Sequence, residues 1–157
     1  MRLALAALAV LAATTAAALA AGPTVPPLVG TDPVTGKHVS LAAYAGRPLV
    51  INVWASWCNG CRQEASDLGE FVNSHPTLAI VGVDTTDSKA GARAFYKVYG
   101  LEYPSIWDPD GAVAHRLHTS GLPTTYFLDG RRRVVASIVG SGTLAQFNAA
   151  LRKTLRG

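Results

Sequence analysis

The chain contains two cysteines, and both lie in the segment Trp57-Cys58-Asn59-Gly60-Cys61. Two intervening residues bring the sulfur atoms within one helical turn, so the pair can form and break a disulfide reversibly. If Cys58 stands at a helix N-terminus, free backbone N–H groups and the helix dipole favour its thiolate. Cys58 would then be the exposed nucleophile, and Cys61, inside the first turn, would be the shielded resolving thiol. The pattern predicts thiol–disulfide exchange.

Two other uses of a cysteine pair are less well supported. A zinc site would need a second cysteine pair, and His115 and His118 have ligand-like spacing but lie 54 residues or more beyond Cys61. A purely structural bridge over so short a loop would constrain the unfolded chain little. A copper carrier that uses Cys58, Cys61 and a histidine stays open as an alternative, and so does a thiol peroxidase.

The elements on either side of the pair place it where a strand ends and a helix begins. Leu49 to Trp54 is an apolar run rich in β-branched residues, which is typical of a strand buried on both faces. After the cysteines, apolar residues recur at helical spacing up to Pro76, which marks the end of that helix. These apolar residues are Ala65, Leu68, Phe71 and Val72.

Further elements alternate along the chain. A second buried strand is predicted at 78–83, and a second helix from a cap at Ser88 to Gly100. A turn at 108–111 precedes a short helical stretch that ends at Leu117. The helical pattern of the second helix puts Phe95, Val98 and Tyr99 on its apolar face.

The C-terminal part of the chain predicts a hairpin followed by a helix. Strands at 124–128 and 133–139 join across Asp129-Gly130, a strong hairpin signal. Thr143 and Gln146 form a capping box for the last helix. The apolar face of that helix is predicted to carry Leu144, Phe147, Leu151 and Leu155.

This order predicts an α/β fold with a central mixed sheet flanked by helices. Two strand–helix–strand crossovers imply parallel pairing, and the hairpin adds an antiparallel strand. Residues 23–33 are rich in Pro, Gly and Thr and predict an approach segment without an element. A turn at 32–36 and a short strand over 37–41 follow, which give an N-terminal β extension. The predicted boundaries are a signal peptide or N-terminal anchor at 1–20, a linker at 21–35 and one domain at 36–157.

Length and composition exclude several classes of protein. The chain has 157 residues and 49% hydrophobic residues, enough for one domain with a real core. The net charge of +4 is mild, and the basic run Arg131-Arg132-Arg133 after Asp129-Gly130 is interpreted as a solvated turn. No basic stripe with interleaved aromatics is present, so nucleic-acid binding is not expected.

The N-terminus has the pattern of an export signal. Residues 3–20 form an apolar run behind Arg2, and Ala18-Leu19-Ala20 fits a cleavage site. Cleavage after Ala20 or Ala21 is the preferred interpretation, because alanine dominates the run and inserts weakly into membranes. An uncleaved membrane anchor is the alternative. Either way, the expected location is outside the cytoplasmic membrane, in the periplasm or secreted, where disulfide chemistry is permitted.

Two separated motifs carry a resemblance to a known family. Trp54-Ala55-Ser56-Trp57-Cys58-x-x-Cys61, followed by the segment from Gly121 to Phe127, resembles the thioredoxin superfamily. Within it, the chain is similar to exported thiol–disulfide oxidoreductases of the ResA/TlpA type, over about residues 26 to 155. The resemblance implies a thioredoxin-like fold, with Cys58 attacking and Cys61 resolving. It also implies a cis Pro123 that, with Leu122 and Trp57, contacts the substrate.

The resemblance assigns further residues to the tuning of the site. Asn52 stands where thioredoxin carries a buried acid, and the acid of the exported branch matches Asp87, with Asp84 as the second choice. Asp87 could relay the proton of Cys61, or it could cap the following helix. The family usually has proline before the second cysteine, whereas this chain has Asn59-Gly60, which predicts a looser first helical turn.

The sequence therefore predicts an extracytoplasmic enzyme that reduces protein disulfides through the Cys58/Cys61 pair. No metal, flavin or nucleotide is expected, since the redox-active disulfide suffices and no Gly-rich phosphate loop is present. A disulfide-forming oxidase would use the same residues at a higher potential. The resemblance implies a membrane electron donor and a link to cytochrome c maturation, and the protein is expected to be a monomer.

Overall fold

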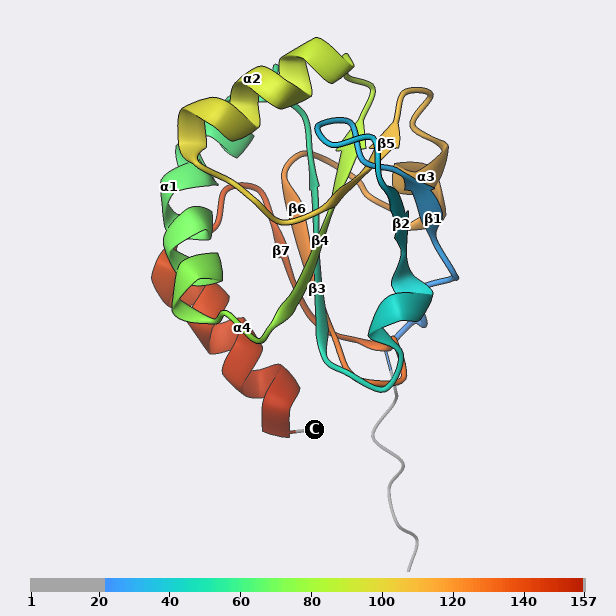
Figure 1. Cartoon of the computed structure of the whole chain (residues 1–157). Helices are drawn as coiled ribbons and strands as arrows, with labels where there is room; N and C mark the ends of the chain where they lie inside the picture. The colour runs from blue at the N-terminus through green and yellow to red at the C-terminus, as the bar shows by residue number, and fades with distance from the viewer. Residues whose placement is uncertain (1–21, 157) are drawn as a thin grey trace, which may run out of the picture.

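The computed structural model describes residues 22–156, which form two sheets and their flanking helices (Figure 1). The strands are β1 (Val29–Thr31), β2 (His38–Ser40), β3 (Leu49–Trp54), β4 (Ala79–Thr85), β5 (Ser105–Asp108), β6 (Thr124–Leu128) and β7 (Val134–Val139). The helices are the 3-10 helix η1 (Leu41–Tyr44) and the α-helices α1 (Asn59–Ser74), α2 (Lys89–Tyr99), α3 (Ala112–Arg116) and α4 (Leu144–Arg156).

A five-stranded sheet of order β5-β4-β3-β6-β7 is the centre of the fold, with β3 in the middle. All six residues of β3 are buried, as the sequence predicted for this strand. Because successive side chains of a strand point to opposite faces, Val50 and Trp54 pack under α1 and α2, while Ile51 packs on the other face. Helices α1, α2 and α4 cover the first face, and α3 with β1 and β2 covers the second (Figure 1).

The predicted ends of the helices are confirmed. Ser88 is the N-cap of α2, and its hydroxyl accepts the Gly91 N–H at 3.0 Å. Gly100 ends that helix in the left-handed conformation, with φ 63°, which glycine adopts without steric cost. Thr143 and Gln146 form the reciprocal capping box before α4.

Two predicted core positions were wrong. Val98 is 73% exposed, because the buried side of α2 is centred on Ala92, Phe95 and Tyr96, and Val98 is turned about 200° from Tyr96. Leu155 is 62% exposed, because the buried side of α4 is centred on Phe147, Leu151 and Thr154, and Leu155 lies at the edge of that side. Helical spacing alone does not show which apolar positions at the edge of a helix face reach the sheet.

The sheet contains one strand that the sequence pattern did not predict. β5, a four-residue edge strand between Pro104 and Pro109, pairs in parallel with β4. The second crossover therefore leads from β4 through α2 to β5, and β6 is instead antiparallel to β3. The prediction of a hairpin between β6 and β7 is confirmed. So short a strand, flanked by prolines, shows too little alternation to be recognised.

The segment 23–33 is more ordered than predicted, since β1 lies within it and pairs with β2. Val25 and Leu28 are buried in the core on the α3 face of the sheet. These two side chains and the β1–β2 pairing attach the proline-rich segment to the domain. The predicted turn is confirmed, because the Asp32 carboxylate accepts the Val34 and Thr35 N–H groups. The predicted N-terminal β extension is this β1–β2 pair.

The predicted export signal at residues 1–20 lies outside the described residues. Within 22–156, no helix is both long and apolar enough to cross a membrane.

Candidate active site

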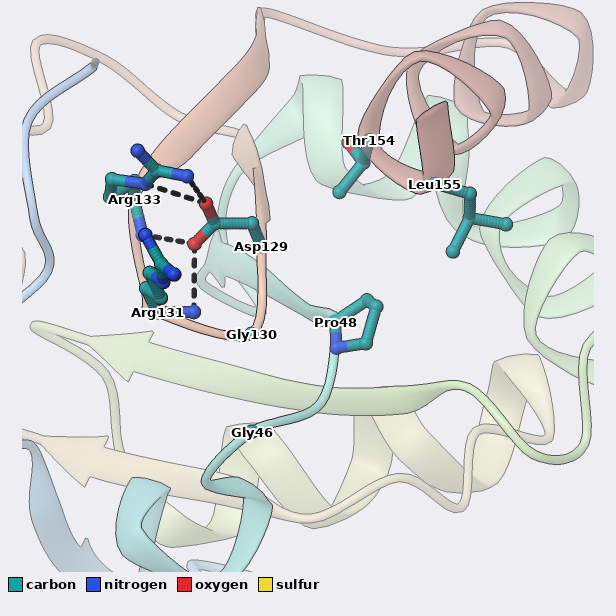
Figure 2. Close-up of a pocket in the computed structure, with 8 residues that line it drawn as sticks. All are labelled: Gly46, Pro48, Asp129, Gly130, Arg131, Arg133, Thr154 and Leu155. Atoms are coloured by element: carbon teal, nitrogen blue, oxygen red, sulfur yellow. Dashed lines mark hydrogen bonds and ion pairs between the residues drawn. The ribbon is translucent and has the colours of Figure 1, made fainter. Parts of the chain in front are cut away.

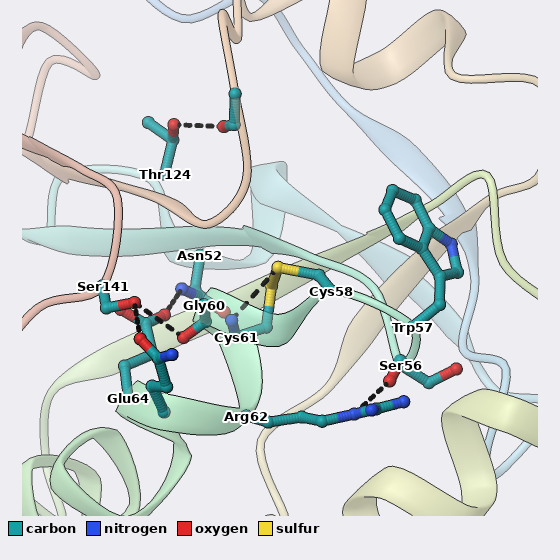
Figure 3. The surroundings of a disulfide bond; sticks show 12 residues. Asn52, Ser56, Trp57, Cys58, Gly60, Cys61, Arg62, Glu64, Thr124 and Ser141 are labelled. Carbon is teal, nitrogen blue, oxygen red and sulfur yellow. Dashed lines mark hydrogen bonds between the residues drawn. A yellow bond between two sulfur atoms is a disulfide. The ribbon is translucent and has the colours of Figure 1, made fainter.

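Cys58 and Cys61 form a disulfide at the junction of β3 and α1, with their Cα atoms 5.3 Å apart (Figure 3). Cys58 is the N-cap of α1, and its Sγ accepts the backbone N–H of Cys61 at 3.1 Å. The strand–helix junction predicted from the sequence is therefore present. In the reduced protein, this N–H group and the helix dipole would favour the Cys58 thiolate over the thiol.

The two cysteines differ less in exposure than the sequence predicted. Cys58 is only 5% exposed and Cys61 2%, so the disulfide is buried and Cys58 is the slightly more open of the two. Trp57 beside them is 54% exposed, and its indole N–H donates to the Thr86 carbonyl at 3.1 Å. The exposed indole forms an apolar surface next to the disulfide (Figure 3), and its contact with a substrate stays a prediction.

Two loops from elsewhere in the chain meet the first turn of α1. The Leu122–Pro123 peptide bond is cis, and the Pro123 carbonyl accepts the Gly140 N–H at 2.8 Å. Ser141, in the loop after β7, donates its hydroxyl hydrogen to the Gly60 carbonyl at 2.9 Å. The sequence predicted the proline loop but not the contribution of the loop that contains Ser141.

Gly60 faces both of these loops at short range. A Cβ atom at this position would lie 2.9 Å from both Pro123 Cδ and Ser141 Oγ. The sequence predicted a loose first helical turn at Gly60, whereas the structure packs this turn against the proline loop. A side chain at this position would require the Pro123 ring and the Ser141 hydroxyl to shift, so the glycine has a packing role.

Gly60→Ala is expected to destabilise the oxidised protein, because the Pro123 ring cannot rotate away from an added methyl group. Overpacking of this kind costs about 1–3 kcal/mol of unfolding free energy, and urea unfolding measures it. Gly121→Ala is the matched control, since no atom lies within 4 Å of its Cβ position. If both variants are as stable as the unmodified protein, the close packing at Gly60 has no energetic weight.

A buried carboxylate lies one helical turn after Cys61. Glu64 is 1% exposed, and its two oxygens accept hydrogen bonds from Asn52 Nδ2 at 2.9 Å and from the Gly142 N–H at 2.8 Å. Burial raises the pKa of Glu64 to about 7, against the partial opposition of these two hydrogen bonds. Residues three apart on a helix are neighbours, so Glu64 lies on the same face of α1 as Cys61.

Asn52 connects the carboxylate to the proline loop. Its side-chain amide also donates to Thr125 Oγ1 at 3.0 Å, two residues after Pro123. The sequence noted Asn52 as a substitute for a buried acid but did not identify Glu64, which brings an acid there from the adjacent helix. A signal was present, because Cys61, Glu64, Ala65 and Leu68 form one helical stripe in which only Glu64 is charged.

Asp87, the acid that the sequence favoured, holds the loop that precedes the cysteines. Its carboxylate accepts the Ser56 N–H at 2.5 Å, the Ser56 hydroxyl at 2.9 Å and the Ser88 N–H at 2.7 Å. The N-cap of α2 is Ser88 rather than Asp87, so the interpretation of Asp87 as the helix cap was wrong. These bonds position the approach to Cys58, and proton relay by Asp87 stays a prediction.

Asp84, the second choice, is fully buried opposite Trp54 at the end of β4. Neither of its carboxylate oxygens has a hydrogen-bond partner among the described residues. Burial, with the nearby charge of Asp87 as the next cause, raises the pKa of Asp84 to about 8. The group is therefore mostly neutral at pH 7.

The two histidines that could have served a metal are exposed at the end of α3. His118 lines a hollow together with Pro26, Tyr126 and Ser137, and neither cysteine is part of its lining. Within 22–156, no three His, Cys, Asp or Glu side chains are grouped so that they could hold a metal ion.

Comparison with known proteins places this arrangement in a family. The family model described as AhpC/TSA matches residues 22–137. The chain belongs to this family. It is 27% identical over 134 residues to "Thiol-disulfide oxidoreductase ResA" of Bacillus thuringiensis subsp. konkukian, a match that covers 84% of this chain and 77% of the relative. The resemblance inferred from the two sequence motifs is thereby confirmed.

Solved structures agree with the fold. A DsbF homologue from Corynebacterium diphtheriae matches with a TM-score of 0.76 and 33% identity, over 82% of this chain and 85% of that one. A secreted thiol-disulfide isomerase from Corynebacterium glutamicum matches with a TM-score of 0.72 and 28% identity, over 83% and 84%. The predicted thioredoxin-like fold, a mixed sheet flanked by helices, is confirmed.

Proposed function

We propose that this protein is an extracytoplasmic thiol–disulfide oxidoreductase that reduces disulfides in other proteins. The observation that carries the proposal is the disulfide between Cys58 at the N-cap of α1 and Cys61 in its first turn. Relatives named as thiol-disulfide oxidoreductases and a neighbour named as secreted support the chemistry and the location. Cytochrome c maturation is the pathway that we propose it serves, as a monomer re-reduced by a membrane electron donor.

The reaction proceeds by two successive thiol–disulfide exchanges. The Cys58 thiolate attacks one sulfur of a substrate disulfide and breaks the bond between the two substrate sulfurs. One substrate thiolate is released and takes up a proton. Cys61 then loses its proton and attacks Cys58 Sγ, which frees the second substrate thiolate and leaves the Cys58–Cys61 disulfide. Two electrons pass to the substrate. A donor dithiol restores the reduced pair by the reverse sequence, so no metal, flavin or nucleotide is required.

Glu64 supplies the proton acceptor in this proposal. A base works best when its pKa is near the working pH, and the pKa of about 7 meets this condition. Its neighbouring position on α1 lets it take the proton of Cys61 in the resolving step. We assign Asp87 a positioning role instead, because its hydrogen bonds hold Ser56 in the loop before Cys58.

The reduction potential of the Cys58/Cys61 couple tests the direction of electron flow. We expect about −220 mV or lower, in the range of thioredoxin and glutaredoxins, by equilibration with glutathione or dithiothreitol. Cys58→Ser, which has no such couple, is the control. A potential near −120 mV, as for strong disulfide-forming oxidants, would make the protein a disulfide donor.

A thiol peroxidase and a metal carrier, the alternatives from other functional classes, would each give a different result with the same protein sample. Fast consumption of hydrogen peroxide without reduction of a protein disulfide would identify a thiol peroxidase. Copper bound in a one-to-one ratio by the reduced protein, and lost in Cys58→Ser, would identify a metal carrier.

A further inference from the structure

Four segments meet at the end of the domain opposite the cysteines, and we call them together the basic end. They are residues 45–48 before β3, 74–78 after α1, the hairpin turn 129–133 and the last part of α4, 151–156. Pro48, Arg131 and Leu155 line one open hollow of about 550 Å³ (Figure 2). Pro48, Pro76 and Leu155 line a second hollow of about 360 Å³. The four segments therefore form one continuous surface.

This surface concentrates the positive charge of the protein. It carries seven of the thirteen Lys and Arg residues within 22–156, and Asp129 is its only carboxylate side chain. Asp129 is already paired with Arg133. The formal side-chain charge is therefore +6 on the basic end and −3 on the rest of the described chain. The seven are Arg47, Arg131 to Arg133, Arg152, Lys153 and Arg156.

The start of the described chain lies at the same end. The Pro23 carbonyl accepts the Val134 N–H, and the Val25 N–H donates to the Arg132 carbonyl, each at 2.9 Å. Thr24 pairs with Arg133 in an isolated bridge. The described chain therefore begins beside the arginine run of the hairpin turn, and the apolar run at residues 3–20 precedes it in the sequence. An apolar segment inserted in a membrane, before cleavage or without it, would hold the basic end at the lipid surface.

We propose that the basic end docks on an anionic membrane surface. Clustered Lys and Arg next to an apolar segment are attracted by anionic headgroups, and the effect is largest within about 10 Å of the lipid at moderate salt. A nucleic acid fits less well, because the basic end has no Phe, Tyr or Trp on which bases could stack.

Docking in this orientation sets where the redox site lies. β3 leads from the basic end to Cys58, and its six residues span about 20 Å. The disulfide therefore faces the aqueous side, where protein substrates are free to reach it. A membrane electron donor would have to carry its own thiols about 20 Å above the lipid surface.

Vesicle binding by the full-length chain tests the proposal. Its affinity is measured for two kinds of vesicle at about 50 mM salt: phosphatidylcholine with 30% phosphatidylglycerol, and pure phosphatidylcholine. The readout is the ratio of the first affinity to the second. The ratio cancels any contribution of the apolar segment. Each cation near an anionic surface adds about fivefold, so R131Q/K153Q/R156Q is expected to lower the ratio by about 100-fold. These three side chains have no hydrogen-bond partner among the described residues, so folding should be unaffected.

The matched control removes three cations elsewhere, in K37Q/R93Q/K97Q, and should change the ratio only a few-fold. Thiol–disulfide exchange in solution should stay unchanged in both variants, which shows that they are folded. An equal loss in both variants, or no loss in either, would overturn the proposal. Tighter binding to duplex DNA or to polyglutamate than to anionic vesicles, with the same dependence on Arg131, would overturn the choice of a lipid surface.

Discussion

Cys61→Ser is expected to stop turnover and to accumulate a covalent complex between Cys58 and the substrate protein. Without the resolving thiol, the mixed disulfide formed in the first exchange has no internal route to release. Turnover should fall by a factor on the order of 10³ or more, since loss of a covalent catalytic group removes the whole pathway. Non-reducing electrophoresis and mass spectrometry of the complex measure the trapped species.

The local structure is the reason that the trap forms on Cys58. Cys58 is the N-cap of α1 and accepts the Cys61 N–H, and it lies next to the exposed Trp57. Cys61 has less exposure and lies in the first turn of α1, three residues after Cys58 and three before Glu64.

Cys58→Ser is the matched control, because it keeps one thiol and removes the nucleophile. It should give neither turnover nor a covalent complex. If Cys58→Ser trapped substrate through Cys61 as well as Cys61→Ser does through Cys58, the assignment of attacking and resolving cysteines would be wrong.

The sequence predicted the parts of the site that depend on neighbours in the chain. A buried strand followed by an amphipathic helix places Cys58 at a helix N-terminus, and the structure has it there. The capping residues Ser88 and Thr143 follow from hydrogen bonds within one helical turn. Such local interactions are readable because both partners lie within a few residues of each other.

Contacts between distant segments were not predictable in this way. Glu64 is held by Gly142, 78 residues away, and Gly60 is constrained by Pro123 and Ser141. The basic end is similar, because the run at Arg131 is an ordinary solvated turn until the fold places the end of α4 beside it. Pairing of β5 with β4 is also non-local, and it changes the expected topology of the sheet. In each case the tertiary fold supplies the second partner.

Glu64→Gln is expected to remove an inflection near pH 7 from the rate of the resolving step. In the unmodified protein, the fraction of Glu64 able to accept a proton rises through its pKa of about 7, so the rate should rise with it. Glutamine cannot accept that proton, and the rate at pH 7.5 should fall by about 100-fold, within the usual range for a general base. Stopped-flow measurement of release from the mixed disulfide between pH 5.5 and 8.5 provides the profile.

The same group gives a readout that does not depend on activity. The pKa of Glu64 is raised from 4.5 to about 7 in the folded protein. Between pH 4.5 and about 7, the native state therefore holds a proton that the unfolded chain has lost. The contribution of this group to the free energy of unfolding is therefore fully present below pH 4.5. It decreases by about 3 kcal/mol as the pH rises to about 7. Glu64→Gln should lack this part of the pH dependence in urea unfolding.

Asp87→Asn separates the two acids. In the unmodified protein the Asp87 carboxylate holds Ser56. The variant should therefore displace this loop and slow the first exchange, while the inflection near pH 7 remains. A merely structural role for Glu64 would lower the rate at every pH and leave the shape of the profile unchanged. If the inflection instead disappears in Asp87→Asn and survives in Glu64→Gln, the proton of Cys61 passes to Asp87, as the sequence first suggested.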